Sequence, residues 1–291
     1  MKKSLLIITM KPSILVGGQA VIEGVMMRVP GSYATAVRDP NGKIHIQKED
    51  FTSITESSSF WRRPIFRGMA SLYESMKMGM KTLNYSADIA MPDEEPQSKF
   101  AEFFSTIFAI FLAVFLFMIA PMWMTTKVMD LEKEAFWFNL VSGGFRIAFF
   151  ILYLLIISML SDVRRLFQYH GAEHRVVYNF ESGKKVNIKN AQSFPTQHPR
   201  CGTSFLFIVL LSAILVFAIV DTVAINIFGT ISLPMRLLFH LPLIPLVSGI
   251  GYELIKLSSR NNSLGFRILK KPGLWLQNIT TKKPEDEMVE V

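Results

Sequence analysis

The sequence predicts an α-helical membrane protein with four transmembrane helices, a small N-terminal α+β domain in the cytosol and a cytosolic loop that carries His and Cys side chains. Half of the 291 residues are hydrophobic, and the apolar residues are gathered in four long runs. A run of about 20 apolar residues can cross the roughly 30 Å of bilayer hydrocarbon as a helix. The expected spans are Phe103–Thr125, Phe138–Leu160, Phe205–Phe228 and Leu233–Ile255.

Lys and Arg are unevenly distributed between the segments that join these spans. The segment between the second and third spans and the stretch after the fourth are rich in both, whereas the turn Gly229–Ser232 has no charge. Because positively charged loops stay cytoplasmic, we expect a multi-pass protein of the cell membrane with both termini in the cytosol. The net charge of +8 fits contact with the lipid bilayer. The sequence lacks the basic, aromatic-interleaved motifs typical of nucleic-acid binding, so we expect no nucleic-acid partner.

The spans also predict the domain boundaries. Residues 1–97 are expected to form the cytosolic α+β domain with an amphipathic helix, 98–160 the first two spans, 161–203 the cytosolic segment with a candidate metal site, 204–256 the last two spans and 257–291 a cytosolic tail. The apolar run Leu5–Ile8 is shorter than the core of a signal peptide and no cleavage motif follows it, so we expect it to be retained. Translation can start at Met1 or at Met10.

Two stretches of the N-terminal domain read as β structure. The segment Gly17–Arg28 is dense in glycine, which favours a tight turn between short strands over a ligand-binding loop, because no phosphate-loop spacing is present. Within it, Glu23 and Arg28 could pair. Alternation around the Asn-Gly turn of Ala34–Gln47 predicts a β-hairpin with His45 on its exposed face.

The segment Pro64–Ala87 has apolar residues at helical spacing, many of them Met, with basic residues around them. Such a helix could lie on the membrane surface or pack on the small β-domain, and we favour packing. An acidic, proline-bounded linker, Met91–Pro96, separates it from the first span.

Ionisable residues inside the spans need partners because a charge in hydrocarbon is costly. Arg146 in the second span and Asp221 in the third lie at similar depth and are expected to pair, for structure rather than as part of a pathway. In the fourth span, Glu253 could pair with Lys256 or lie near the His/Cys segment.

The candidate chemistry is concentrated between Tyr169 and Ser204, which contain three of the five histidines and the single cysteine. On a helix, His170, Glu173 and His174 project from one face. His198 and Cys201 could add nitrogen and sulfur ligands, so we expect a divalent metal, zinc by preference, on these four side chains.

His170, Glu173 and His174 match the H-x-x-E-H pattern of inverzincins, in which Glu activates a water, so Glu173 would be the catalytic base or support a ligand. A protease of that class is disfavoured because those enzymes are large soluble α/β proteins; Glu253 would have to serve as a distant third ligand. The alternative without metal is a solvated helix followed by a turn, with Thr203 or Ser204 capping the third span.

Three motifs occur in order: Gly17–Arg28, Tyr169–His174 and His198–Phe205. Together they resemble the YqhQ-like family of bacterial polytopic membrane proteins, from about Gly17 to Pro272, with the acidic tail Glu285–Glu290 outside the shared region. The family is described as a domain of unknown function and labelled a predicted metal-dependent enzyme. The resemblance therefore implies a bacterial inner-membrane protein and a metal-dependent enzyme, but it names no substrate.

Two function classes stay open on the sequence alone. One is a metal-dependent, hydrolase-type enzyme at the cytosolic face of the membrane. The other is a non-catalytic membrane factor or scaffold that binds another membrane protein, with a structural metal fastening the segment 161–203 to the β-domain. Four spans without a strongly polar lining argue against a channel or transporter of the usual size.

Overall fold

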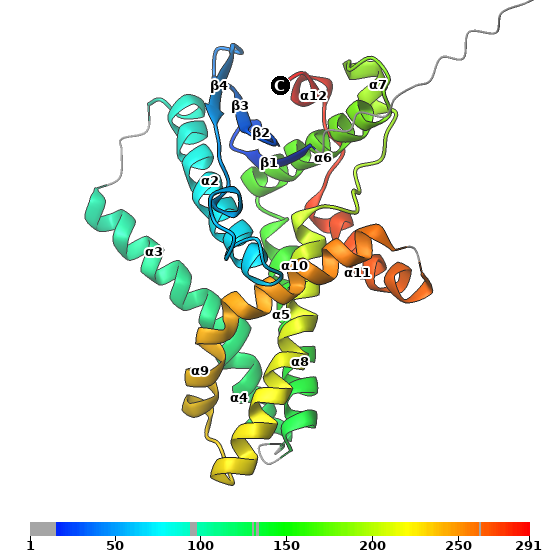
Figure 1. Ribbon diagram of the computed structural model, residues 1–291. Helices are drawn as coiled ribbons and strands as arrows, with labels where there is room; N and C mark the ends of the chain where they lie inside the picture. The colour runs from blue at the N-terminus through cyan, green and yellow to red at the C-terminus, as the bar shows by residue number, and fades with distance from the viewer. Residues whose placement is uncertain (1–15, 94–97, 130, 132–133, 262) are drawn as a thin grey trace, which may run out of the picture.

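The computed structural model describes residues 16–93, 98–129, 131, 134–261 and 263–291. A bundle of apolar helices forms its lower part, and a small sheet with several helices lies above the bundle (Figure 1). The expectations for Leu5–Ile8, Met1 and Met10 fall outside the described residues, as does the acidic half of the linker at 94–96.

The N-terminal sheet is an antiparallel meander in the order β1-β2-β3-β4. Its strands are β1 (Gly17–Val21), β2 (Gly24–Val29), β3 (Ser32–Arg38) and β4 (Ile44–Asp50). The tight turn after β1 and the hairpin of β3 with β4 are therefore confirmed. The expected Glu23–Arg28 pair is wrong, because Glu23 lies in the turn and Arg28 near the far end of β2, about 16 Å away at 3.3 Å per residue. Glu23 binds Arg165 instead.

Helix α2 (Phe66–Ala90) packs on the sheet, as favoured, and also on the fourth span. The Met-rich face was expected to be the packed one, and this is wrong: Met76 and Met80 are 63% and 57% exposed. The buried face carries small and polar residues together with one methionine, Met78, which packs against the sheet. A Cβ atom on Gly79 would lie 2.9 Å from the side-chain oxygen of Gln19. At Gly79 the absence of a side chain lets the helix approach Gln19 closely, which a larger side chain at this position would prevent.

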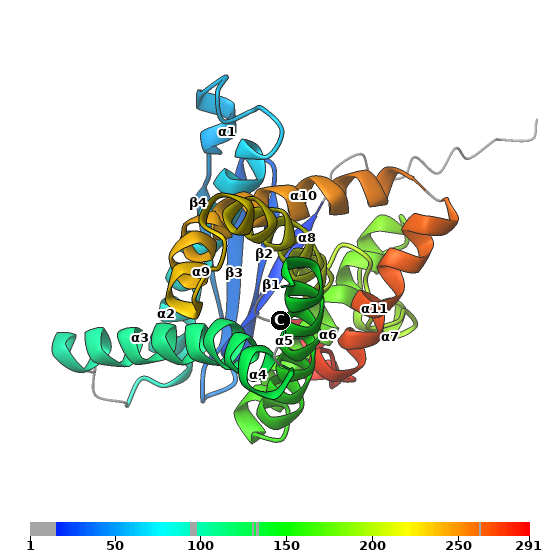
Figure 2. The same cartoon turned by 90° about the horizontal axis from the view of Figure 1, so that it is seen from below.

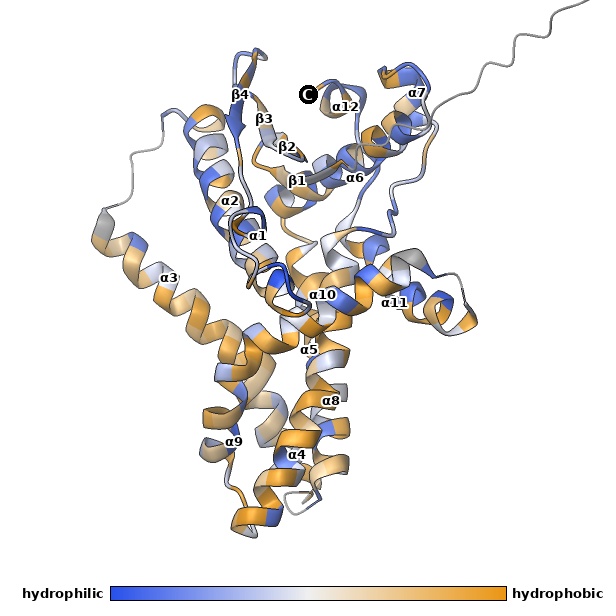
Figure 3. Cartoon of the chain, viewed as in Figure 1, coloured by the Kyte–Doolittle hydropathy of each residue, from blue (hydrophilic) through white to orange (hydrophobic). Residues whose placement is uncertain are grey.

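Within the described residues, four helical stretches are long and apolar enough to cross a membrane: Phe100–Met129, Ala135–Ile157, Gly202–Phe228 and Leu233–Ser258. They confirm the four expected spans, and Figure 3 shows their apolar surfaces in the lower part of the molecule. The first comprises α3 (Lys99–Val114), a π-helical turn (Phe115–Ile119) and α4 (Ala120–Met129); the second and third are α5 (Ala135–Ile157) and α8 (Gly202–Phe228). Seen from below, α3 runs outward from the bundle (Figure 2).

The fourth span contains α9 (Leu233–His240), a 3-10 turn (Leu241–Leu243) and most of α10 (Ile244–Arg260). The change of helix type falls at Pro242 and Pro245, which cannot donate main-chain hydrogen bonds. Inside the bundle, the expected Arg146–Asp221 ion pair is not formed in the described part of the chain. Asp221 binds Arg236 and His240 of α9 instead.

The stretch expected to be a tail is folded against the rest of the molecule. Helix α11 (Leu264–Thr280) packs on α8, and α12 (Asp286–Glu290) packs on α6 (Ser161–Glu181) and α7 (Ile188–Gln192) (Figure 1). Met288 and Val289 of α12 share a buried core with Val25 of β2 and Tyr169 of α6. The C-terminal segment thus joins the sheet to the helix that carries the candidate site.

Candidate metal centre

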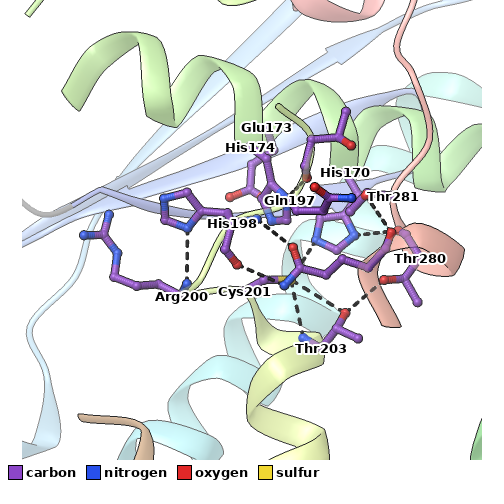
Figure 4. Close-up of polar contacts among 12 residues, drawn as sticks. His170, Glu173, His174, Gln197, His198, Arg200, Cys201, Thr203, Thr280 and Thr281 are labelled. Carbon is purple, nitrogen blue, oxygen red and sulfur yellow. Dashed lines mark hydrogen bonds and ion pairs between the residues drawn. The ribbon is translucent and has the colours of Figure 1, made fainter. Parts of the chain in front are cut away.

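The candidate site lies where α6 meets the start of α8 (Figure 4). His170, Glu173 and His174 occupy one turn of α6, and Cys201 is the residue that precedes the first turn of α8. The Cys201 sulfur accepts the Thr203 backbone N–H at 3.4 Å, so Cys201 caps this helix rather than Thr203 or Ser204. The sulfur therefore lies at the N-terminus of α8, against its Thr203 backbone N–H.

Three of the four predicted ligands come together. The ligand atoms of His170, His174 and Cys201 all lie within 4.8 Å of one another. The His170 Nε2 atom is 3.2 Å from the Cys201 sulfur, and the two imidazole rings have centroids 4.5 Å apart. This is a set of two imidazoles and one thiol, a combination that zinc accepts.

The other ring nitrogen of each histidine is held by a backbone carbonyl. The Nδ1 atom of His170 lies 2.8 Å from the Thr280 carbonyl oxygen, and the Nδ1 atom of His174 contacts the Thr196 carbonyl. Because a carbonyl oxygen only accepts hydrogen bonds, both Nδ1 atoms carry the proton, and both Nε2 atoms have a lone pair for a metal. Histidine ligands in metal sites are commonly oriented by such a bond.

His198 does not join this group. Its Nδ1 atom accepts the Arg200 backbone N–H at 3.3 Å, and its Nε2 atom lies 3.8 Å from the Glu181 carboxylate. The ring centroid is 5.6 Å from that of His174. Burial lowers the pKa of His198 to about 4, with further contributions from His174 and Arg200. The described geometry thus places the predicted fourth ligand beside the cluster, with its ring nitrogens directed to other groups.

Glu173 is buried beside His174, and only 7% of its surface is exposed. Its Oε2 atom is 4.0 Å from the His174 Nε2 atom. Burial raises the pKa of Glu173 to about 7, and the nearby His170 acts against this shift. No hydrogen bond to this carboxylate occurs among the described residues. A buried carboxyl group that titrates near neutral pH and is not held by a hydrogen bond is suited to accept and return a proton.

Several contributors to the site were not predicted from the sequence. Thr280 of α11 orients His170, and Gln277 of the same helix accepts the His198 backbone N–H at 2.7 Å and donates to the His198 carbonyl at 2.9 Å. Gly18 of β1 lies against Glu173, where a Cβ atom would be 2.7 Å from the Glu173 Cγ atom. The Gly-Gly pair at the start of the first motif was the one signal that could have pointed to such a close approach.

Glu253, considered as a distant third ligand, lies outside the cluster. Its carboxylate binds Arg67 of α2 through both oxygens. It also accepts the Ile65 backbone N–H at 3.4 Å. Glu253 therefore connects the fourth span to α2.

A known protein family and one known protein match this chain over most of its length. The chain matches the family described as "Protein of unknown function (DUF1385)" over residues 63–291. The match reaches residue 291, so the expectation that the acidic tail Glu285–Glu290 lies outside the shared region is wrong. The packing of α12 on α6 agrees with a tail that belongs to the fold. The chain is also 31% identical to "Uncharacterized protein YqhQ" of Bacillus subtilis (strain 168), over 94% of this chain and 89% of that protein. No solved structure matches. The chain is thus a member of the DUF1385 family, to which its YqhQ-like motifs had pointed.

Proposed function

We propose that His170, His174 and Cys201 bind a zinc ion at the cytosolic face of a bacterial inner membrane, and that the site catalyses a hydrolytic reaction. The observation that carries this proposal is the orientation of the two histidines. Each has its Nδ1 atom bonded to a backbone carbonyl, which leaves the Nε2 lone pair for a metal. The His170 Nε2 atom is 3.2 Å from the Cys201 sulfur, and the ligand atoms of the three residues all lie within 4.8 Å of one another. The cytosolic placement rests on the Lys and Arg residues that flank the spans on this side.

Three protein ligands are the number that catalytic zinc sites use, because the fourth position is left for water or substrate. When bound, zinc lowers the pKa of a coordinated water to about 7. Glu173 is then the proton acceptor: its Oε2 atom is 4.0 Å from one ligand atom, and its pKa of about 7 lets it take up and release a proton near neutral pH. In this proposal His170 and His174 hold the metal, and Glu173 moves the proton.

A non-catalytic role is the second candidate, and the position of His198 favours it. Its ring lies 5.6 Å from that of His174. A rotation of the side chain could supply a fourth ligand, which would close the coordination sphere as in structural sites. The metal would then fasten α6 to the start of α8 in a membrane factor that binds another membrane protein.

Metal content and complementation separate these functions. We expect wild-type protein to bind zinc stoichiometrically, His170→Ala and Cys201→Ser to lose it, and Glu173→Gln and His198→Ala to keep it. In a deletion strain, Glu173→Gln should fail to complement although its membrane level is normal. Complementation by Glu173→Gln together with loss of zinc in His198→Ala would establish the structural role. Absence of zinc from wild-type protein would refute the metal site.

A further inference from the structure

A second cluster of ionisable side chains lies inside the bundle, away from the candidate metal centre. It contains Arg146 of α5, Asp221 of α8, and Arg236 and His240 of α9, all at most 3% exposed. Arg146 is the central residue of α5, about 16 Å from Ala135 at 1.5 Å per residue. The cluster therefore lies deep in the apolar part of the molecule, where charged groups are rare and functional by default.

Both oxygens of the Asp221 carboxylate contact residues other than Arg146. One oxygen lies 2.8 Å from the His240 Nε2 atom, and the other binds the Arg236 guanidinium and accepts the Asn139 side-chain amide at 2.7 Å. Asp221 acts on Arg146 only through space. The Arg146 guanidinium lies over the Phe217 ring, 5.2 Å from its centroid.

Arg146 has two buried nitrogen atoms, Nε and Nη2, with no hydrogen-bond partner among the described residues. These two N–H groups point in the same direction. Together they form a guanidinium fork, which can donate hydrogen bonds to both oxygens of one anion. The chain uses the same pair elsewhere: Arg67 binds Glu253 through Nε and Nη2, and Arg165 binds Glu23 in the same way. The fork of Arg146 has the same chemistry but no carboxylate from the described residues.

The charge of Arg146 indicates the kind of ligand. Its guanidinium forms no ion pair with a described residue and has two buried nitrogen atoms to offer. Ser142, one helical turn before Arg146, also has a buried hydroxyl without a partner among the described residues. A ligand with one negative charge and two oxygens would neutralise the guanidinium and accept hydrogen bonds from both nitrogen atoms.

We propose that Arg146 and Ser142 form a binding site for a monoanionic oxyanion group, a carboxylate or a phosphodiester, in the interior of the bundle. This site is independent of the metal centre. A soluble organic acid and the phosphodiester of an anionic lipid share this chemistry. The experiment therefore has one arm for each source.

The first arm uses full-length protein in a zwitterionic detergent and records thermal unfolding during titration with acetate or dimethyl phosphate, against chloride at equal ionic strength. The second arm uses bilayer discs with and without phosphatidylglycerol. The variants are Arg146→Gln, Arg146→Lys and, as a matched control, Arg164→Gln, which removes an exposed Arg at the start of α6. Wild-type protein supplies the titration even if a variant folds poorly.

We expect a saturable rise in the unfolding temperature of wild-type protein and of Arg164→Gln, and none in Arg146→Gln. Arg146→Lys should bind at least about tenfold more weakly, because an ammonium cannot present two parallel donors. A response to acetate or dimethyl phosphate identifies a soluble acid as a competent ligand; a response only to phosphatidylglycerol identifies the lipid. An equal response to chloride, an equal response in Arg146→Gln, or none in either arm would overturn the site.

Discussion

Replacing Gly18 by Ala tests whether the sheet positions Glu173. The added Cβ atom would lie 2.7 Å from the Glu173 Cγ atom, 2.8 Å from its Oε1 atom and 2.8 Å from the Met26 carbonyl oxygen. Non-bonded carbon atoms prefer separations of about 3.5–4.0 Å. The Met26 carbonyl belongs to a strand and Glu173 is buried, so neither can move freely. We expect a destabilisation of about 1–3 kcal/mol, the usual range for overpacking.

The neighbouring glycine supplies the control. A Cβ atom on Gly17 would meet nothing within 4 Å, so Gly17→Ala should change stability by no more than about 0.5 kcal/mol. Thermal unfolding of both variants and the wild type, with zinc content measured alongside, gives the comparison. Gly18→Ala should unfold at a lower temperature and keep its metal, because the displaced carboxylate is not one of the three ligands. Equal unfolding temperatures for the two variants would show that Glu173 is not held by β1.

Two further predictions concern the membrane topology and the packing of Gly171. Because the native cysteine is buried, single exposed cysteines can report topology: Thr230→Cys should react with an impermeant thiol reagent in intact cells, and Lys184→Cys only after the membrane is opened. The reverse labelling would refute the proposed orientation. Gly171→Ala would place a Cβ atom 2.0 Å from the Lys282 carbonyl oxygen; it should displace the segment that carries Thr280 and lower both the unfolding temperature and zinc content, whereas wild-type values would contradict this packing.

The features that the sequence could predict are those set by local pattern. Four apolar runs predicted the spans, the Asn-Gly turn predicted the hairpin, and the spacing of His170, Glu173 and His174 predicted their common face on a helix. Each depends on residues that are close in the chain. Cys201 was predicted as a further ligand because a thiolate suits zinc. It lies next to His170 because α8 begins beside α6.

The features that the sequence did not predict depend on contacts between distant segments. The Thr280 carbonyl orients His170 across 110 positions of the chain, and no local signal marks a main-chain oxygen as a partner. Likewise, the hydrophobic spacing of α2 predicted an apolar packed face, whereas Gly79 makes the close contact with Gln19. Periodicity identifies faces but not which one a neighbouring element covers.

The buried pair of Asp221 and Arg236 allows a test of whether Asp221 is coupled to the arginine that it contacts or to Arg146, which only lies at a similar depth. Arg146 and Asp221 lie at similar depth, but depth does not fix the direction in which a helix presents a side chain. Asp221→Asn removes the Asp221 carboxylate from its ion pair with the fully buried Arg236, a loss expected to cost about 3–5 kcal/mol.

In a double-mutant cycle measured by thermal unfolding and membrane abundance, Asp221→Asn with Arg236→Gln should lose less than the sum of the single changes, by about 0.5–3 kcal/mol. The matched cycle with Arg146→Gln should show a smaller coupling energy, because Arg146 acts on Asp221 only through space. A larger coupling to Arg146 than to Arg236 would mean that Arg146 is the direct partner. The Arg146 fork would then be occupied by Asp221, and no room would remain for the anion proposed above.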